Sequence, residues 1–145
     1  MKLPKEFRNG FIIFLGIGLY FLLMILLGLG NITALRLLNV VFVFYGVNQT
    51  IKMNLNEGKK NFVSNAISAF VTSLVGVFLS IIGLLFYSYM RGGDTYIQSL
   101  SKTFLFGGNP TVNTYCISLL FEGIASSVIV TLLLMLYTNN KYVAD

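Results

Sequence analysis

Long runs of mainly apolar residues alternate with short polar connections along this chain of 145 residues. Four such runs cover residues 11–30, 32–51, 62–90 and 111–137. A membrane-spanning helix needs about 20 mainly apolar residues, because each residue adds about 1.5 Å across a hydrocarbon layer roughly 30 Å thick. The pattern therefore predicts an all-α polytopic membrane protein, in which a bundle of four transmembrane helices forms a single domain over residues 1–145.

The third run, Phe62 to Met90, has no charged side chain. Small residues recur along it at alternating spacings of three and four, so they share one stripe of a helix. Lipid gives helices no hydrophobic reason to associate, and small side chains let a neighbouring helix approach closely and gain dispersion contacts. We expect this helix to be the hub of the bundle, with a helix-packing stripe formed by Ala66, Ala69, Ser73, Gly76, Ser80 and Gly83.

The first run follows a basic amino terminus, an arrangement that secretory signal peptides also have. Gly28-Leu29-Gly30 even imitates a small-x-small cleavage site. The run is longer than a typical signal-peptide core, however, and three further apolar runs follow it. We therefore interpret it as a retained first helix.

Residues 92–110 form the one sizeable connection, and both of its ends are rich in glycine. Apolar residues recur between these ends at helical spacing, which predicts a short amphipathic helix on the outer membrane surface. Docking of a partner and capping of a cavity are the alternatives. The apolar positions of this segment are Tyr96, Ile97, Leu100, Phe104 and Leu105.

Composition supports the membrane class and opposes a soluble fold. Hydrophobic residues make up 56% of the chain and charged residues only 10%, which leaves too few polar side chains to cover a soluble domain. The net charge of +5 does not indicate a nucleic-acid partner, because the basic residues stand singly or in pairs beside the apolar runs. Such residues are typical of topology signals and of contacts with the lipid bilayer.

The distribution of Lys and Arg predicts the orientation. One side of the membrane would hold Lys2, Lys5, Arg8, Lys52, Lys59, Lys60 and Lys141. The other side would hold Arg36, Arg91 and Lys102. The positive-inside rule then places both termini in the cytoplasm, with the amphipathic segment outside. We expect a multi-pass protein of the bacterial inner (plasma) membrane.

Two gaps in the residue inventory argue against a metal or redox centre. The chain has no histidine, which is the usual ligand for haem, zinc or copper, and a single cysteine, Cys116, which excludes an internal disulfide. We interpret Cys116 as a small packing residue. No nucleophile-base pair or phosphate-binding loop is present either, so we expect no cofactor, no metal, no catalytic residue and no enzymatic activity.

Glu122 is the acidic residue that lies well inside a predicted span. A charged carboxyl near the membrane centre costs about 2.5–3.5 kcal/mol, so its side chain should face protein or water and be protonated unless paired. It is either a proton or cation site, or a charge that recognises a basic residue of a partner, or a neutral group that only holds helices together. We expect it to belong to an intramembrane polar site with Ser118 and Ser126, at i−4 and i+4, and with Asn39 and Arg36.

Arg36 and Asn39 share one face of the second predicted helix. Arg36 lies about one turn inside the helix, so it can extend its guanidinium to the headgroups. Depth counting separates it from Glu122 by about 10 Å along the membrane normal, which strains a direct salt bridge. Asn39 lies deeper and should hydrogen-bond another helix.

Several stretches together resemble a known kind of protein. They are an apolar hairpin, the polar loop Asn56-Glu57-Gly58-Lys59-Lys60-Asn61-Phe62, the small-residue third helix, the exit Phe86-Tyr87-Ser88-Tyr89 and a final helix. The chain resembles small four-helix bacterial inner-membrane proteins that are classed only as a domain of unknown function. The resemblance implies a four-helix bundle and brings no catalytic residues.

Two functions fit these features. The first is a noncatalytic accessory or scaffolding subunit of a larger inner-membrane complex, with other membrane subunits or copies of itself as partners. Its basis is the small extramembrane content, the packing stripe and the lack of cofactor ligands. The alternative is a small oligomeric transporter or channel, in which several copies line a path that uses Glu122 as a proton or cation site.

Overall fold

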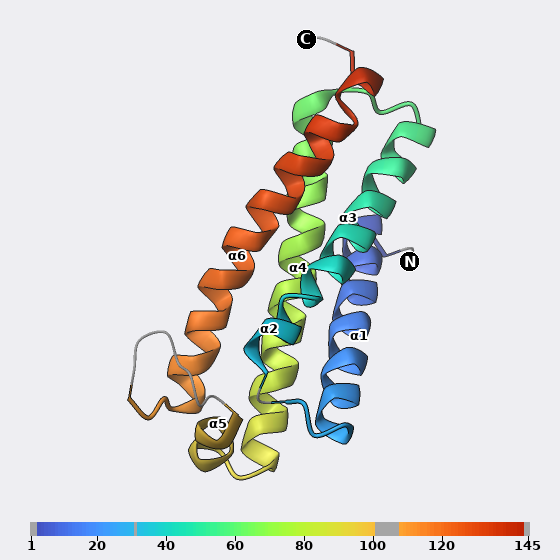
Figure 1. Cartoon of the computed structure of the whole chain (residues 1–145). Helices are drawn as coiled ribbons and strands as arrows, with labels where there is room; N and C mark the ends of the chain where they lie inside the picture. The colour runs from blue at the N-terminus through green and yellow to red at the C-terminus, as the bar shows by residue number, and fades with distance from the viewer. Residues whose placement is uncertain (1–2, 31, 101–107, 144–145) are drawn as a thin grey trace.

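The computed structural model describes residues 3–30, 32–100 and 108–143, which form a helical bundle (Figure 1). Four helical segments are long and apolar enough to cross a membrane, which confirms the four-helix, all-helical prediction for the described residues. The elements are α1 (Lys5–Leu26), α2 (Thr33–Arg36), α3 (Asn39–Asn56), α4 (Phe62–Met90), α5 (Asp94–Leu100), α6 (Val112–Tyr137) and the 3-10 helix η1 (Asn139–Lys141).

The first helix begins earlier and ends earlier than the apolar run that predicts it. It starts at Lys5, after Pro4, whose fixed φ suits a helix start. It ends because Gly28 adopts a positive φ, with the Leu29 N–H donating to the Met24 carbonyl and the Gly28 N–H to the Ile25 carbonyl. This is a Schellman motif, which glycine favours. The helix that contains most of the predicted span of about 11–30 is thus Lys5–Leu26.

The second predicted helix is divided into α2 and α3. Leu37 and Leu38 separate the two, and their N–H groups donate to the carbonyls three residues earlier, Ala34 and Leu35. Such tighter 3-10 bonding lets a helix change direction without proline. The prediction of one helix over 32–51 is therefore corrected, because two helices occupy this segment. The second of them, α3, continues to Asn56 and is followed by a turn at Gly58.

The third helix has the predicted boundaries of Phe62–Met90. Its first turn is capped by Asn61, whose side chain accepts a hydrogen bond from the Ser64 N–H. The fourth helix starts one residue later than predicted, because Thr111 is its N-cap and accepts from the Thr114 N–H. The amphipathic segment forms α5, while its predicted apolar positions Phe104 and Leu105 lie outside the described residues.

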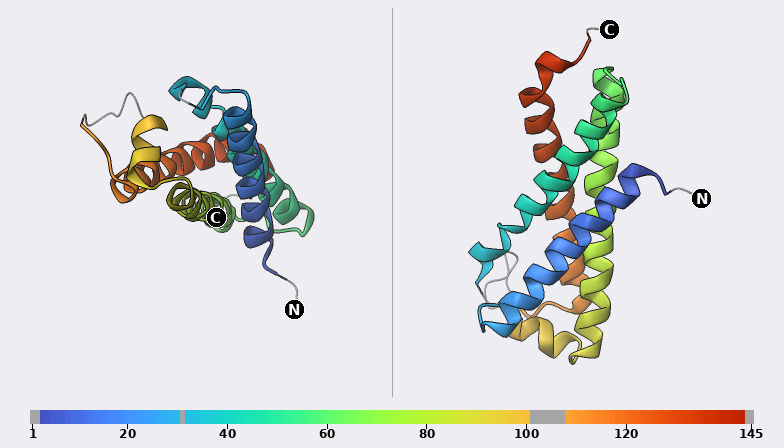
Figure 2. Two further views of the ribbon diagram at one scale, coloured as in Figure 1. Left: turned by 90° about the horizontal axis from the view of Figure 1, so that it is seen from below. Right: turned by 90° about the vertical axis from the view of Figure 1, so that its right-hand side faces the viewer.

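The bundle is organised around α4, as the sequence predicts. Helix α4 contacts α1, α3 and α6, and its contacts with α1 and α6 are the most extensive in the bundle. α6 and α1 lie on either side of α4 (Figure 1). α1 and α3 run side by side and both are inclined to α4 (Figure 2, right).

Two clusters of buried apolar side chains fill the bundle at different levels. The larger joins α1, α3, α4 and α6, and Ile13 lies fully buried within it. The smaller joins α5 to the first turns of α6 and includes Ile97 and Cys116. Cys116 is thus buried among apolar neighbours, as expected for a packing residue. A cavity borders both clusters.

Candidate functional site

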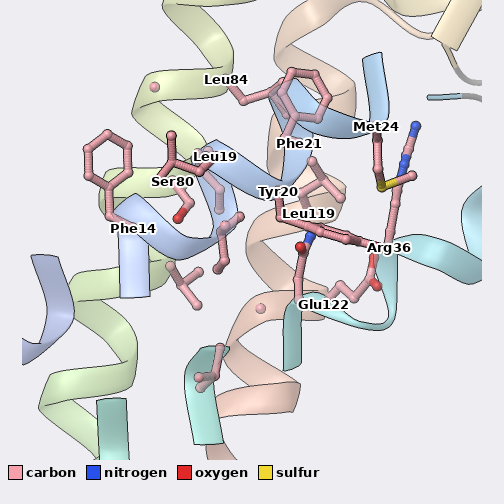
Figure 3. Close-up of a pocket in the computed structure, with 18 of the residues that line it drawn as sticks. Phe14, Leu19, Tyr20, Phe21, Met24, Arg36, Ser80, Leu84, Leu119 and Glu122 are labelled. Atoms are coloured by element: carbon pink, nitrogen blue, oxygen red, sulfur yellow. The ribbon is translucent and has the colours of Figure 1, made fainter. Parts of the chain in front are cut away.

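The cavity lies among α1, α2, α3, α4 and α6, and it has a volume of about 430 Å³ (Figure 3). Its walls are mainly apolar and aromatic. Leu19, Leu22 and Leu37 line it and are also exposed at the surface of the bundle. The cavity therefore reaches the surface that lipid would cover, and its size falls within the range of roughly 300–1,000 Å³ that is usual for small-molecule pockets.

Arg36 lies at the end of the cavity next to α5. Its Nη1 donates to the Tyr115 hydroxyl, and its Nη2 lies 3.4 Å from the Gly30 carbonyl oxygen and 3.3 Å from the Leu100 carbonyl oxygen. The guanidinium also lies 5.5 Å from the centre of the Tyr115 ring. One side chain thus connects α2, the α1–α2 link, α5 and α6, instead of only extending to the headgroups as the sequence analysis expected.

Glu122, on α6, also lines the cavity, and its side chain is exposed. Among the described residues, no hydrogen bond or ion pair involves its carboxyl group. It is near enough to Arg36 to interact with it electrostatically, although the two groups are not in ion-pair contact. Figure 3 shows the two residues towards the same side of the view, away from Phe14.

The other predicted members of the polar site have different positions. Asn39 and Ser126 line the cavity with Glu122 and Arg36. Ser118 is not among the lining residues, and its hydroxyl donates to the Thr114 carbonyl on its own helix. The predicted hydrogen bond from Asn39 to another helix is absent within the described part of the chain, where its Oδ1 is buried without a partner.

The predicted packing stripe on α4 faces two environments. Ala69 and Ser73 are buried, Ala66 packs against the larger cluster, and Gly76 lies against Ile13 of α1. Ser80 and Gly83 line the cavity. The Ser80 hydroxyl donates to the Gly76 carbonyl, so it is satisfied within its helix.

The amphipathic helix α5 closes the bundle next to the site. Asp94 accepts a hydrogen bond from the Val112 N–H at 2.8 Å, so it ties α5 to the start of α6. Tyr96 packs edge-on against Tyr87, which lines the cavity, with ring centres 5.8 Å apart. Burial raises the pKa of Tyr96 to about 12. The link from Asp94 to Val112 was not anticipated, since it depends on how two separate helices meet.

A buried polar cluster, which the sequence did not predict, lies towards the other end of the bundle. The Asn9 amide donates to the Thr50 hydroxyl at 2.9 Å, and the Thr50 and Thr72 hydroxyls lie 2.9 Å apart. All three side chains are buried, and they connect α1, α3 and α4. This cluster holds helices together and does not line the cavity.

The site has few groups with reactive chemistry. No cluster of three or more Cys, Asp or Glu residues that could hold a metal ion occurs within residues 3–30, 32–100 and 108–143. Comparison of the chain with family models, curated proteins and solved structures finds no match. The resemblance to small four-helix inner-membrane proteins therefore still depends on the sequence pattern alone. What the arrangement offers chemically is an apolar cavity with one unpartnered carboxyl group.

Proposed function

We propose that this chain is a small noncatalytic membrane transporter that binds an amphiphilic solute in the cavity beside Glu122. One observation carries the proposal: an unpartnered carboxyl group faces an apolar cavity of about 430 Å³ that borders the lipid-facing surface. A polar group left unpaired inside a membrane protein is costly, and such groups commonly mark solute or ion pathways. This proposal develops the transporter hypothesis, with the site inside one chain instead of between several copies.

The proposed orientation follows the charge distribution. Lys5 and Lys59 both pair with Glu57, so the amino terminus and the α3–α4 link share one end of the bundle. Arg36 and α5 belong to the other end. With the more basic end in the cytoplasm of a bacterial inner membrane, the cavity would lie in the outer half of the bilayer.

Native mass spectrometry of the chain released from its own membranes tests the proposal. The wild-type protein should retain a small-molecule adduct in a fixed ratio. A Gly18→Leu variant should lose it, because Gly18 lines the cavity and has open space where a side chain would be built. A Gly18→Ala variant is the matched control and should keep the adduct. An adduct that survives Gly18→Leu would contradict a solute site in this cavity.

An accessory subunit of a larger inner-membrane complex is the second candidate. The observation that favours it is the small size of the described parts outside the four spans, chiefly α5 and η1. The same preparation distinguishes the two candidates. Recovery of the chain with one larger protein in constant ratio, and with no small-molecule adduct, would favour the subunit.

A further inference from the structure

The two charged side chains at the cavity, Arg36 and Glu122, differ in whether they have hydrogen-bond partners within the protein. Both Nη atoms of Arg36 are directed to protein oxygens, those of Tyr115, Gly30 and Leu100. Glu122 has no hydrogen-bond or ion-pair partner among the described residues. A ligand with a positive centre would therefore complete the site, whereas an anion would meet the unpaired Glu122 carboxyl group beside a guanidinium whose two Nη atoms already face protein oxygens.

The walls of the cavity select for an organic cation over an inorganic one. Aromatic side chains line it from three helices, among them Phe14, Tyr20, Phe21, Tyr87 and Tyr115. Aromatic faces attract cations with delocalised or alkylated charge, and the apolar remainder favours a hydrophobic body. A small metal ion would lose its hydration shell here without gaining the several oxygen ligands that it requires.

A positively charged ligand would also offset the free-energy cost of placing the Glu122 carboxyl group inside the membrane. An isolated charge inside a membrane is costly, and such charges are usually paired with an opposite charge. Arg36 interacts with Glu122 electrostatically without touching it, so room remains for a second positive group at the carboxyl. The volume of about 430 Å³ leaves space for a drug-sized body beside that group.

We infer that the cavity binds a lipophilic organic cation, whose charged centre pairs with the Glu122 carboxylate and whose apolar groups lie against the aromatic and aliphatic walls. This inference rests on the proposed solute site and specifies the class of its ligand.

Two ions of equal shape and opposite charge test the inference. Tetraphenylphosphonium and tetraphenylborate are offered separately to the purified full chain in detergent, and binding is measured by equilibrium dialysis. The wild-type chain should bind the phosphonium saturably, at one ion per chain, and should bind the borate at least tenfold more weakly. Glu122→Gln should weaken phosphonium binding at least tenfold, whereas Glu57→Gln, which alters a surface carboxyl outside the cavity, should not change it.

Two further variants keep the test decisive if Glu122→Gln does not fold. Glu122→Asp retains the charge and should retain phosphonium binding. Gly18→Leu fills the cavity and should abolish it. Equal or tighter binding of the borate, or unchanged phosphonium binding in Glu122→Gln, would overturn the cation inference.

The outcomes also separate the ligand class from the solute site. Borate binding that Gly18→Leu abolishes would reject the cation and leave the solute site standing. Binding of neither ion would reject the lipophilic cation, and the native adduct experiment would then decide whether the cavity holds a solute of another class.

Discussion

The side chain of Ile13 occupies the space beside Gly76 that a β-carbon would need. A β-carbon built at Gly76 would lie 2.6 Å from the Ile13 Cγ2 and 2.7 Å from its Cβ. Gly46 of α3 meets Ile13 in the same way, at 2.3 Å from its Cγ1. One fully buried isoleucine therefore sits between glycines of two helices, and this contact brings α1, α3 and α4 close together.

Gly76→Ala should lower the free energy of unfolding by about 1–3 kcal/mol, because the new methyl group overpacks the contact with Ile13. Gly18→Ala is the matched control, since nothing lies within 4 Å of a β-carbon at that position. It should leave stability unchanged or raise it by up to about 1 kcal/mol through helix propensity. Thermal unfolding in detergent measures both. Equal stability of the two variants would contradict the close contact.

Thr50→Val should destabilise the bundle by about 0.6–2 kcal/mol, because it removes the hydroxyl that joins Asn9 to Thr72 inside the bundle. Valine has nearly the same shape, so the effect reports the hydrogen bonds and not the packing. Thr50→Ser keeps the hydroxyl and should recover most of the loss. Denaturant titration followed by circular dichroism gives the comparison, and a stable Thr50→Val variant would show that the cluster contributes little.

Arg36→Lys should loosen α5 and the α1–α2 link. A lysine ammonium cannot reach the oxygens of Tyr115, Gly30 and Leu100 in the fork geometry of a guanidinium. Hydrogen exchange in α5 should then become faster by at least severalfold. Arg91→Lys is the control, because Arg91 is exposed and interacts with Tyr87 on its own helix. Equal exchange rates in both variants would argue against Arg36 as the connecting residue.

Acid should weaken the contact between the amino terminus and the α3–α4 link. A hydrogen bond from Lys5, and then one from Lys59, lower the pKa of Glu57. A carboxyl group with a lowered pKa in the folded state adds stability above its unfolded pKa, and this contribution disappears as pH falls through the folded pKa. In Glu57→Gln, the dependence of stability on pH in this acidic range should become flatter. An unchanged profile would show that the surface pair adds nothing measurable.

The features of the fold that could be predicted are the apolar helices, which follow from solvation, and a helix end that is marked by glycine. Apolar runs have to form helices in a membrane, because their backbone groups cannot bond to lipid, so the four spans could be recognised without any contact information. The end of α4 beside the glycines at 92 and 93 was recognised for the same local reason. The start of α1 was missed because Lys5–Asn9 is mostly polar, and the burial of Asn9 depends on its contacts with Thr50 and Met53 of α3.

The candidate site could be predicted only in part. Polarity inside the apolar runs was enough to group Glu122 with Arg36 and Asn39, although depth, which is proportional to residue number, separated Arg36 from Glu122 by about 10 Å. The rotation of each helix about its axis cannot be counted from residue number in this way. Ser118 was therefore included, although its hydroxyl donates to a carbonyl of its own helix. No proline or glycine in the sequence marks the break between α2 and α3 at Leu37 and Leu38. The aromatic walls likewise depend on the inclination of α1 against α4, which is a property of the assembled bundle (Figure 2).

The cavity borders both apolar clusters, and it therefore lies next to the packing that holds the helices together at each of the two levels. The larger cluster joins α1, α3, α4 and α6. The smaller one joins α5 to the start of α6, and apolar side chains of α4 pack against it. A bound ligand would contact side chains of both clusters, so it would add a bridge between the two levels at which the helices are packed.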